Sequence, residues 1–588
     1  MKGNIEPIEQ THPWRRMDWY CLAFLLCLVA LTWCAAYNRW TSESWATPIS
    51  YGGDAWGTLA GAKAFSTGEI PPILPKYPAS LGAPFRANWN DYPTVEEGMW
   101  VWTALLARAF GLFTGANLSL LSASLFAATS FYFVGRRMQC GPAFAFTGAA
   151  LFALSRFIFA RSLPHLPLTY YWHVPLGLLV IWYCLTNTLI HKDRRMVLFC
   201  VAVAILHGVQ NAYYTAMFFQ FLVGAALFHL IRRQPWPRIF FPLILGGVLL
   251  FTLGVMNLDT LYYRAVHGPN PIAVTRTYAA LELYALKPIE LFLPITHRFG
   301  PLERWVMIKY ARQAYVVGEM GSPYLGLAGI AGLLLLVWET ARRLARQQLD
   351  QVPFQIWPVL WILAYSVVGG INGLLGLFGV ILFRCSNRYG IFILALVLLF
   401  LMQRLTAWTR RWHWLPALLL AASIVTLGAW DQIPGSPATA QIAATRQMVQ
   451  ADAAMVATLE RRLPKDAMIF QMPVMDFPEV SPVRGVADYE HIRPYLYSKQ
   501  LRFSYGSNKG RKRERWQKEA EQLGTSRLVG LLESYGFSAV LINRKGYEDG
   551  ATAMLQELKS LGKTEVLFES PEFFCVVLTP AARPILPP

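Results

Sequence analysis

The sequence predicts an α-helical membrane protein that crosses the bilayer many times and carries a small C-terminal α/β domain outside it. Of the 588 residues, 55% are hydrophobic and only 15% are charged, whereas soluble domains carry about 25% charged residues. The hydrophobic residues form runs of roughly 20, the length that spans a bilayer. Lysine and arginine gather in short clusters between these runs, a pattern typical of the cytoplasmic loops of multi-spanning proteins.

The net charge and the cysteine content argue against a nucleic-acid-binding protein, a zinc site and a disulfide framework. The formal net charge is +18, but its placement between apolar runs indicates a bilayer rather than a nucleic acid as the partner. No basic-aromatic nucleic-acid motif accompanies the basic clusters. The eight cysteines lie mostly inside apolar runs and form no CxxC pair, so neither a zinc site nor a disulfide framework is favoured.

The N-terminus is expected to remain attached as a first membrane helix. A polar cytoplasmic leader, residues 1–17, ends in Arg15 and Arg16 and precedes the apolar run from Asp18 to Tyr37. That run is long enough to span, and no convincing small-residue cleavage site follows Cys34. With the arginines in the cytoplasm, the helix leads to the outer face.

Residues 38–117 are expected to form one long outer loop. Ala55–Phe65 is helical in pattern and Met99–Phe113 is amphipathic, so both are expected to lie along the membrane surface. The alternative is that Met99–Phe113 crosses the membrane. The run from Leu118 to Val134 leads directly into Arg136 and Arg137, which favours a return to the cytoplasm at that point instead.

The remaining apolar runs alternate with basic clusters, which gives about eleven crossings in a membrane domain of residues 18–430. A second long outer loop occupies residues 257–322. No crossing requires a basic cluster on the outer side. The expected crossings are 18–37, 118–134, 143–159, 166–190, 196–210, 212–231, 239–256, 325–338, 356–369, 390–405 and 414–430.

Residues 431–588 are expected to form a periplasmic α/β domain, because composition changes near Asp431 and about 150 residues suffice for a core. The densest charge block, Lys509–Lys518, is interpreted as a solvated helix start, with anionic lipid headgroups as the second interpretation. Helical patterns cover 441–462, 528–535 and 551–561, and strand patterns cover 467–471, 538–542 and 574–578.

One carboxylate in the first outer loop is the leading candidate for chemistry. Asp54 lies between the pair Gly52-Gly53 and Trp56, in the stretch Tyr51–Ala60. The ordinary interpretation is that Asp54 caps the helix that follows. The alternative is that it faces a substrate as a base or a metal ligand.

Basic residues at the outer face provide a second group of candidates. Charges close to hydrocarbon are costly and are functional candidates by default, and the guanidinium fork suits phosphate. Snorkelling is the ordinary alternative for Arg384 and Arg388, and a hydrogen-bonding role is the alternative for His165. The basic candidates are Arg384, Arg388, Lys287, His165, Arg86 and Arg161.

These features together resemble the GT-C superfamily of polyprenol-phosphate-dependent glycosyltransferases over roughly residues 15–430. The resemblance rests on an early acid in the first outer loop, surface helices after it, and a helix that ends in Gly135-Arg136-Arg137. The segment from Tyr92-Pro93 to Leu118 and the connection from Pro164-His165-Leu166 to Pro175 are also similar. The C-terminal domain resembles tails on bacterial membrane proteins labelled sugar or phosphoglycerol transferases.

The resemblance implies a bacterial inner-membrane enzyme with an inverting mechanism. It would transfer a hexosyl or pentosyl group from a polyprenyl-phosphate donor to an extracytoplasmic glycan, lipid or protein. Asp54 would be the base, and Arg384 and Arg388 would hold the departing phosphate, with Lys287 or His165. Many members carry a second acid beside the first, whereas Ala55 follows here. A need for Mg²⁺ or Mn²⁺ therefore stays open, and the candidates for a second carboxylate are Asp91 and Glu96.

Two alternatives remain. A transporter or flippase of lipid-linked sugars would place its charges along a path near the bilayer midplane, whereas the charges here gather at the outer edge. A non-catalytic envelope assembly protein would tolerate substitution of Asp54 and would depend on the residues after Asp431.

Overall fold

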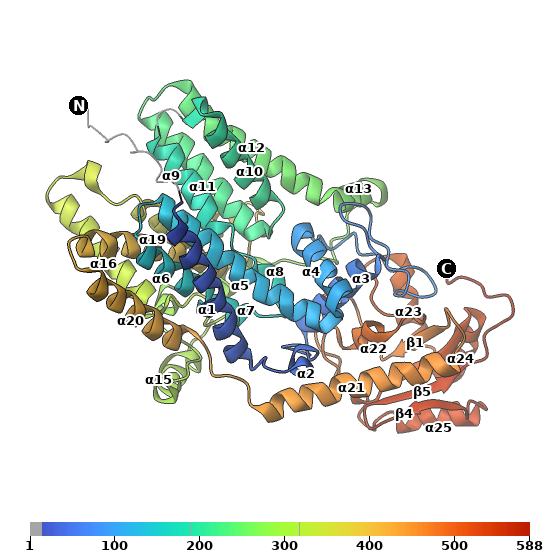
Figure 1. The fold of residues 1–588 in the computed structure, drawn as a ribbon. Coiled ribbons are helices and arrows are strands. Elements are labelled where there is room, and N and C mark those ends of the chain that lie inside the picture. Colours follow the sequence, from blue (N-terminus) through green and yellow to red (C-terminus); the bar gives the residue numbers. More distant parts are fainter. Residues whose placement is uncertain (1–13, 188–189, 317) are drawn as a thin grey trace.

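The computed structural model describes residues 14–187, 190–316 and 318–588. Helices form the larger part of the molecule, and the C-terminal sheet lies at one end of this helical body (Figure 1). The long helix α21 (Thr439–Arg462) runs from the helical body along the sheet. The chain is thus a polytopic helical protein with a small α/β domain, the fold class expected from the sequence.

Seven helices in the described part of the chain are long and apolar enough to cross a membrane. An eighth crossing results if the bent pair α17 (Ile356–Ser366) and α18 (Ile371–Leu377) counts as one span. The seven are α1 (Arg16–Tyr37), α5 (Leu112–Arg137), Pro142–Arg161 with α6 (Pro142–Ala153) and α7 (Arg156–Arg161), α11 (Ala212–Ile231), α12 (Trp236–Met256), Ser386–Thr409 with α19 (Gly390–Thr409), and α20 (Trp414–Gln432).

The expected number of eleven crossings is not confirmed. The helices α9 (Val174–Thr186) and α10 (Arg194–Gly208) have 13 and 15 residues, fewer than the roughly 20 that span a bilayer. The helix α16 (Gly326–Ala345) has 20 residues, but its last turns carry Glu339, Arg342 and Arg343. Short helices and helices with charged ends resemble spans in a hydropathy pattern, but they lack the length or the apolar composition of a typical span.

Small residues and one central helix account for the packing of the helical body. On α5, small residues such as Ala123, Ala127 and Ala128 are buried, and small residues allow helices to approach closely in a bilayer. The helix α19 is buried on all sides from Gly390 to Met402, as expected for a helix that is apolar all round.

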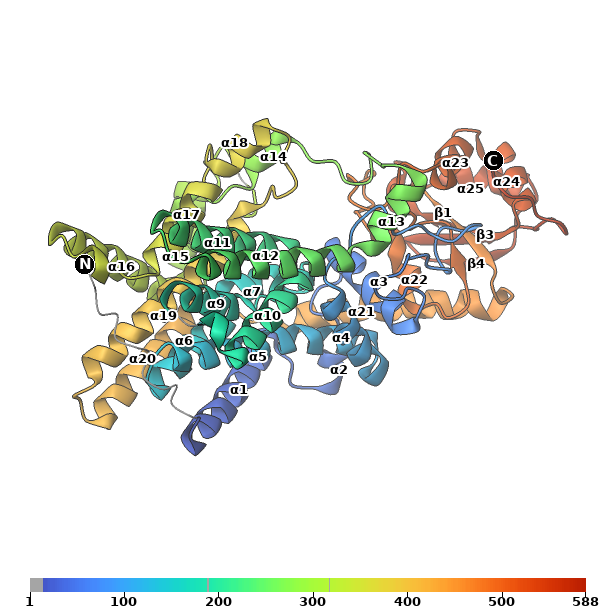
Figure 2. The same cartoon turned by 90° about the horizontal axis from the view of Figure 1, so that it is seen from above.

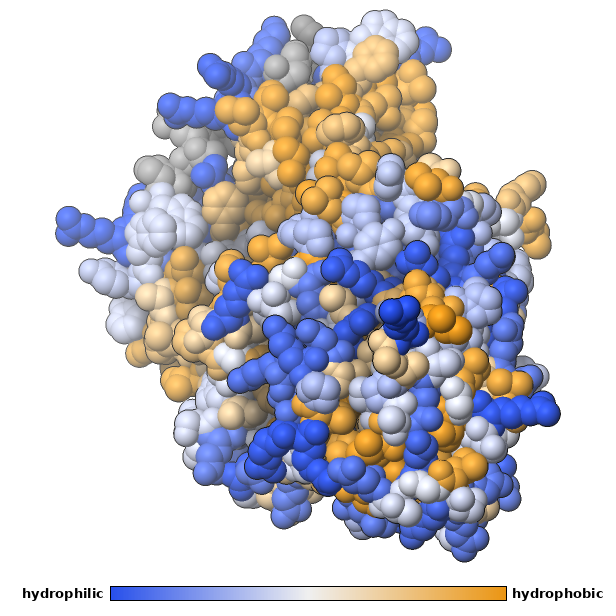
Figure 3. Space-filling model, turned by 90° about the vertical axis from the view of Figure 1, so that its right-hand side faces the viewer, coloured by the Kyte–Doolittle hydropathy of each residue, from blue (hydrophilic) through white to orange (hydrophobic). Residues whose placement is uncertain are grey.

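Apolar side chains also cover much of the outside of the helical body. Figure 3 shows a broad apolar region above the more hydrophilic C-terminal domain. On α12, Phe240, Ile244 and Phe251 are exposed, and on α20 the same holds for Leu419 and Leu427. A surface of this kind suits lipid rather than water, in agreement with a multi-span membrane protein.

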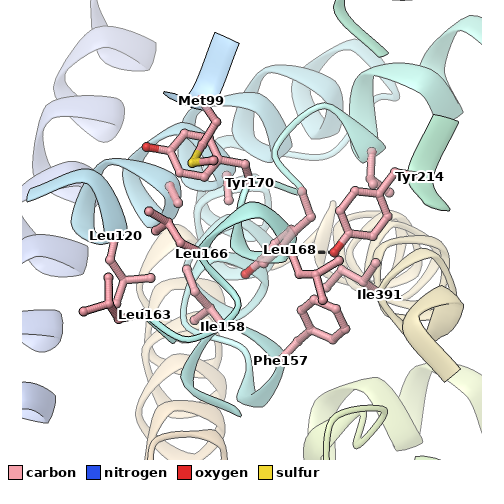
Figure 4. Close-up of a cluster of buried hydrophobic side chains, with 14 of the residues drawn as sticks. Met99, Leu120, Phe157, Ile158, Leu163, Leu166, Leu168, Tyr170, Tyr214 and Ile391 are labelled. Atoms are coloured by element: carbon pink, nitrogen blue, oxygen red, sulfur yellow. Dashed lines mark hydrogen bonds between the residues drawn. The ribbon is translucent and has the colours of Figure 1, made fainter. Parts of the chain in front are cut away.

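Two of the expected surface helices are present in the first loop (residues 38–117). They are α3 (Asp54–Thr67) and α4 (Glu97–Phe110), which pack on each other. A buried cluster joins α4 and α5 to the connection between α7 and α9 (Figure 4). The remaining short helices are α2 (Ser42–Trp45), α8 (Leu166–Thr169), α13 (Leu258–His267), α14 (Tyr278–Leu283) and α15 (Gly300–Val306).

The C-terminal domain contains a five-stranded sheet in the order β2-β1-β3-β5-β4. The strand β1 is parallel to β2 and β3, and β5 is antiparallel to β3 and β4. The strands are β1 (Met468–Met472), β2 (Arg502–Phe503), β3 (Phe537–Asn543), β4 (Val566–Glu569) and β5 (Phe573–Val577), and the helices after α21 are α22 (Arg493–Tyr497), α23 (Lys512–Glu521), α24 (Thr525–Ser534) and α25 (Thr552–Ser560).

The elements expected for this domain are present, with two short strands added. The strands β2 and β4 have two and four residues, too few to show a clear alternating pattern. The helix α23 begins inside the densest charge block, at Lys512, in agreement with a helix that starts there.

The first loop and the C-terminal domain form one continuous structure. Leu81 of the loop makes a parallel bridge to Phe503 at the edge of the sheet. The Ala83 N–H donates to the Phe503 carbonyl at 2.9 Å, and the Trp89 Nε1–H donates to the Gly506 carbonyl at 2.7 Å. The loop therefore extends the sheet, and it fixes the domain beside α3 (Figure 2).

Candidate active site between the first loop and the C-terminal domain

Asp54 is the first residue of α3, and its carboxylate is half-exposed, at 52%. The cap position belongs to Gly53, whose φ of 51° lies in the left-handed region that glycine tolerates. Among the described residues no side-chain hydrogen bond caps this helix. The positive end of the helix still favours a carboxylate at this position, and the side chain remains partly open to solvent.

His165 accompanies Asp54. Its Nε2 lies 3.3 Å from Asp54 Oδ2, and its side chain is also partly exposed. The Thr58 hydroxyl donates to the Pro164 carbonyl at 3.2 Å, so α3 is attached to the connection that carries His165. The two side chains that the sequence selected separately thus form one acid–imidazole pair.

The C-terminal domain contributes Asp488 to the surroundings of Asp54. Tyr489 adopts a left-handed φ of 63°, and its ring lies on α3 where a Cβ on Gly57 would be only 3.2 Å from the ring. Burial, together with repulsion from the Asp54 charge, raises the pKa of Asp488 to about 6. Asp488 therefore lies within electrostatic reach of Asp54, across the junction between loop and domain.

Two arginines from distant parts of the chain meet on Glu319. Arg161 Nη2 lies 2.7 Å and Arg388 Nη2 lies 2.8 Å from its carboxylate oxygens. Burial would raise the pKa of Glu319, but the charges of Arg388 and Arg161 hold it well below its usual range. We call this group the Glu319 clamp.

A second pair of arginines meets on Glu479, and we call this group the Glu479 clamp. Arg276 Nη1 lies 2.8 Å and Arg384 Nη2 lies 4.0 Å from the carboxylate, and the Tyr92 hydroxyl donates to it at 2.8 Å. Although burial opposes the shift, hydrogen bonds from Arg276 lower the pKa of Glu479. Arg384 also lies over the Tyr284 ring at 5.2 Å.

The acid–imidazole pair and the two clamps belong to one region. The Val480 N–H donates to Asp488 Oδ2 at 3.2 Å and the Glu479 N–H donates to the Tyr489 hydroxyl at 3.3 Å, while the Tyr489 ring lies on α3. The Glu479 clamp and the first turns of α3 therefore contact the same segment of the C-terminal domain. Arg384 and Arg388 are four positions apart where the chain enters α19, and they connect the two clamps. The region therefore combines a half-exposed acid with four guanidinium groups.

Glu96 lies close to this region. Its Oε1 accepts a hydrogen bond from Asn211 Nδ2 at 2.6 Å, and burial raises its pKa to about 7. Arg388 is near enough for its charge to oppose that shift. Glu96 is therefore a partly buried acid within electrostatic reach of Arg388.

Three other candidates from the sequence have different surroundings. Asp91 is buried and bound by Arg511 of the C-terminal domain at 2.7 Å, which is a link between the loop and the domain. Arg86 lines a separate pocket of about 260 Å³ with Tyr77, Phe85 and Arg513. Lys287 donates to the Leu283 carbonyl at 3.3 Å and lies 3.9 Å from Glu290.

The sequence did not single out the acids that face the arginines. Glu319, Glu479 and Asp488 are isolated carboxylates in segments without helix or strand, and no motif marks them. The available signal was the excess of arginine at one face, since buried cations require anionic partners. That signal indicates that partners exist but does not identify them.

The residues do not form an evident metal site. Within residues 14–187, 190–316 and 318–588, no three histidine, cysteine, aspartate or glutamate side chains are grouped so as to hold a metal ion. All eight cysteines lie in these ranges and are free thiols. We therefore derive no step through a metal ion.

Comparisons with known proteins identify similar structures but no matching family. No family model matches the sequence, and no curated protein matches it. An oligosaccharyltransferase from Archaeoglobus fulgidus, in complex with Zn and sulfate, has a TM-score of 0.45 and 12% identity over 90% of this chain and 69% of its own. ArnT from Cupriavidus metallidurans, bound to undecaprenyl phosphate, has a TM-score of 0.39 and 13% identity over 96% and 98%. At these identities and TM-scores, neither structure assigns a family or an activity to this chain.

Proposed function

We propose that this protein is a membrane glycosyltransferase that moves a sugar from a polyprenyl-phosphate carrier to an acceptor at the outer face of the bacterial inner membrane. The observation that carries the proposal is a half-exposed acid, Asp54, paired with His165, together with two pairs of arginines that meet on Glu319 and on Glu479 of the C-terminal domain. An acid that accepts a proton and cations that bind phosphate are the two requirements of this transfer.

The roles of the residues follow from their chemistry. Asp54 would take the proton from the attacking hydroxyl or amide of the acceptor, and His165 would hold its carboxylate in position. The acceptor atom forms a bond to the anomeric carbon while the bond from that carbon to the phosphate oxygen breaks. Attack from the side opposite the phosphate inverts the anomeric configuration.

The arginines would stabilise the leaving group. When the glycosidic bond to the carrier breaks, negative charge increases on the phosphate oxygens, and guanidinium groups stabilise that charge most strongly in a water-poor site. Arg161, Arg384 and Arg388 are the side chains proposed for this role. The C-terminal domain, with Asp488 beside Asp54, would form one wall of the acceptor path.

The test is glycosyl transfer by the full-length protein in liposomes. The reaction would contain a radiolabelled sugar on polyprenyl phosphate and an envelope extract from a deletion strain as the pool of acceptors. Asp54→Asn and Asp54→Ala should lower transfer by about 10²–10⁴-fold. Glu43→Gln provides a matched control, because Glu43 is an exposed carboxylate of the same loop, at 70% exposure. Near wild-type transfer by both Asp54 variants would overturn the proposal.

The same preparation tests two further points. Transfer with EDTA and with added Mg²⁺ or Mn²⁺ determines whether a divalent ion is required. Movement of an intact lipid-linked sugar across the liposome membrane, without a new glycosidic bond, would favour a flippase instead. Mass spectrometry of envelope glycans and lipids from the deletion strain would identify the sugar and the acceptor.

A further inference from the structure

A short helical element of the second long loop projects from the helical body. It consists of α15 (Gly300–Val306) and the π-helical turn that continues it, Met307–Ala311, and we call it the loop helix. In Figure 1, α15 lies beside the end of α20. The loop helix contributes no side chain to the acid–imidazole pair or to the two clamps.

One face of the loop helix is attached to the rest of the protein. Val306 is fully buried, and Glu303 accepts a hydrogen bond from the His297 N–H at 3.2 Å. The Tyr310 hydroxyl donates to Glu290 at 3.0 Å. The positions 303, 306 and 310 are three and four residues apart, the spacing of one helical face, so these contacts hold the element in one orientation.

The opposite face exposes apolar and basic side chains together. Trp305 is 54% exposed and Ile308 is 48% exposed. Basic side chains flank this apolar pair in a helical projection. The exposed basic residues of the face are Arg304, Lys309 and Arg312.

No acidic side chain balances these bases. Glu303 is the only acid from residue 291 to residue 316, and it belongs to the attached face. The exposed face is therefore amphipathic and carries positive charge alone.

The loop helix begins where a membrane-spanning helix ends. The Arg298 side chain donates to the carbonyls of Ile433 and Pro434 at 3.1 and 3.3 Å. These two residues directly follow α20. The start of the loop helix is therefore bound to the point at which the chain leaves α20.

The lipid-facing surface of α20 continues to the same level. Leu419 and Leu427 are 59% and 60% exposed, and Trp430 near the helix end is 42% exposed. Tryptophan is enriched where a spanning helix passes from hydrocarbon to headgroups. The ring centroids of His297 and Trp430 are 5.2 Å apart, so the loop helix begins at the level of the headgroups.

We propose that the exposed face of the loop helix is an interfacial anchor that binds anionic phospholipids at the membrane surface. Its apolar side chains would enter the boundary between headgroups and acyl chains, as those of surface helices do. Its basic side chains would reach the headgroup phosphates at the edges of the face. The inference goes beyond the proposed glycosyl transfer and does not depend on it.

The basic side chains determine which lipid is preferred. Each lysine or arginine near an anionic surface strengthens attachment about fivefold. The apolar pair gains from any lipid, because burial of apolar surface does not depend on headgroup charge. Three exposed bases without an acid therefore favour an anionic headgroup over a zwitterionic one.

The test is photocrosslinking by the full-length protein in liposomes of equimolar phosphatidylglycerol and phosphatidylcholine, with one of the two lipids radiolabelled in each preparation. The photoreactive residue p-benzoylphenylalanine replaces Ile308. In a matched control it replaces Leu523, which is 43% exposed on the C-terminal domain. Position 308 should label lipid at least about tenfold more than position 523. It should also label phosphatidylglycerol at least about fivefold more than phosphatidylcholine.

Charge variants test the headgroup preference. The labelling ratio should fall to about one in the triple variant Arg304→Gln, Lys309→Gln, Arg312→Gln. Salt at about 1 M should have the same effect, since it shortens the Debye length to about 3 Å. The wild-type ratio should persist in a control that removes three exposed bases of α23, namely Lys512→Gln, Arg513→Gln, Arg515→Gln.

Amide hydrogen exchange provides a second measurement on the protein without a crosslinker. Residues 300–311 should exchange more slowly in nanodiscs of phosphatidylglycerol than in nanodiscs of phosphatidylcholine, because attachment suppresses local opening. The triple variant of the loop helix should lose this difference, and the α23 control should keep it.

Three results would overturn the inference. Equal lipid labelling from positions 308 and 523 would show that the loop helix does not reach the membrane. A lipid ratio near one in the wild type, or a ratio that the triple variant retains, would show that anionic headgroups are not recognised. A crosslink from position 308 to a second protein chain in place of lipid would show that this face is a protein interface. None of these results depends on glycosyl transfer, so the proposed function is tested separately.

Discussion

The link between Arg511 and Asp91 provides the most direct test of how the C-terminal domain is held. Arg511 of the domain binds the buried Asp91 of the first loop in a bidentate manner, through Nε at 2.8 Å and Nη2 at 2.7 Å. It also donates to the carbonyls of His267 and Gly268 at 2.9 Å each. One side chain thus connects the domain with both loops, and we expect Arg511→Ala to loosen all three segments.

The magnitude follows from what the substitution leaves behind. Removal of one partner of a buried ion pair costs about 3–5 kcal/mol, because the other charge remains buried. Arg511 is 20% exposed, so water reaches part of the space that it vacates. Asn88 and Asn270 continue to donate to Asp91 at 2.8 and 3.1 Å. These two effects place the expected loss at the lower end of the range, about 3 kcal/mol.

The assay is thermal unfolding of the purified protein, followed by tryptophan fluorescence, with limited proteolysis of the connection before α21. Arg511→Ala should lower Tm and accelerate cleavage there. Arg515→Ala, which removes an exposed arginine of the same helix, is the matched control. The double variant Asp91→Asn, Arg511→Ala should recover part of the loss, since no unpaired charge remains. An effect of Arg511→Ala no greater than that of the control would refute the reasoning.

Three further predictions concern other charged groups. The folded-state pKa of Asp488, about 6, lies above its unfolded value, so the folded state binds the proton more tightly and stability should increase as pH falls from about 7 to 5. Asp488→Asn should remove this part of the pH dependence of Tm, and an unchanged profile would contradict the assignment. Lys76→Met should destabilise the protein by about 3–5 kcal/mol, because the fully buried Lys76 pairs with Glu97 and Asp259. A free energy of unfolding equal to that of the wild type would show that these two ion pairs are not required for stability. Arg388→Lys should weaken binding of undecaprenyl phosphate about tenfold although the charge is kept, because lysine cannot form the bidentate contact. Equal affinity of Arg388→Lys and the wild type would indicate that charge alone is needed.

The sequence determined the class of the protein and provided several candidate site residues. Hydrophobic runs predict which segments contact lipid, and basic clusters predict which loops lie in the cytoplasm. Both predictions depend only on local composition. Local periodicity also located α3, α21 and most strands of the C-terminal sheet. Asp54 and the arginines before α19 were found because charge near hydrocarbon is rare and therefore conspicuous.

Only the tertiary structure decided which groups face one another. Arg276 and Glu479 are 203 positions apart, and Asp91 and Arg511 are 420 positions apart, so no local pattern connects them. The number of crossings also depended on the structure, because α9 and α10 have apolar sequences but are too short to span alone. Ion pairs and helix lengths result from how distant segments pack, whereas composition and periodicity describe each segment by itself. For this reason the sequence provided a candidate acid and candidate cations, and the structure identified the carboxylates that bind those cations.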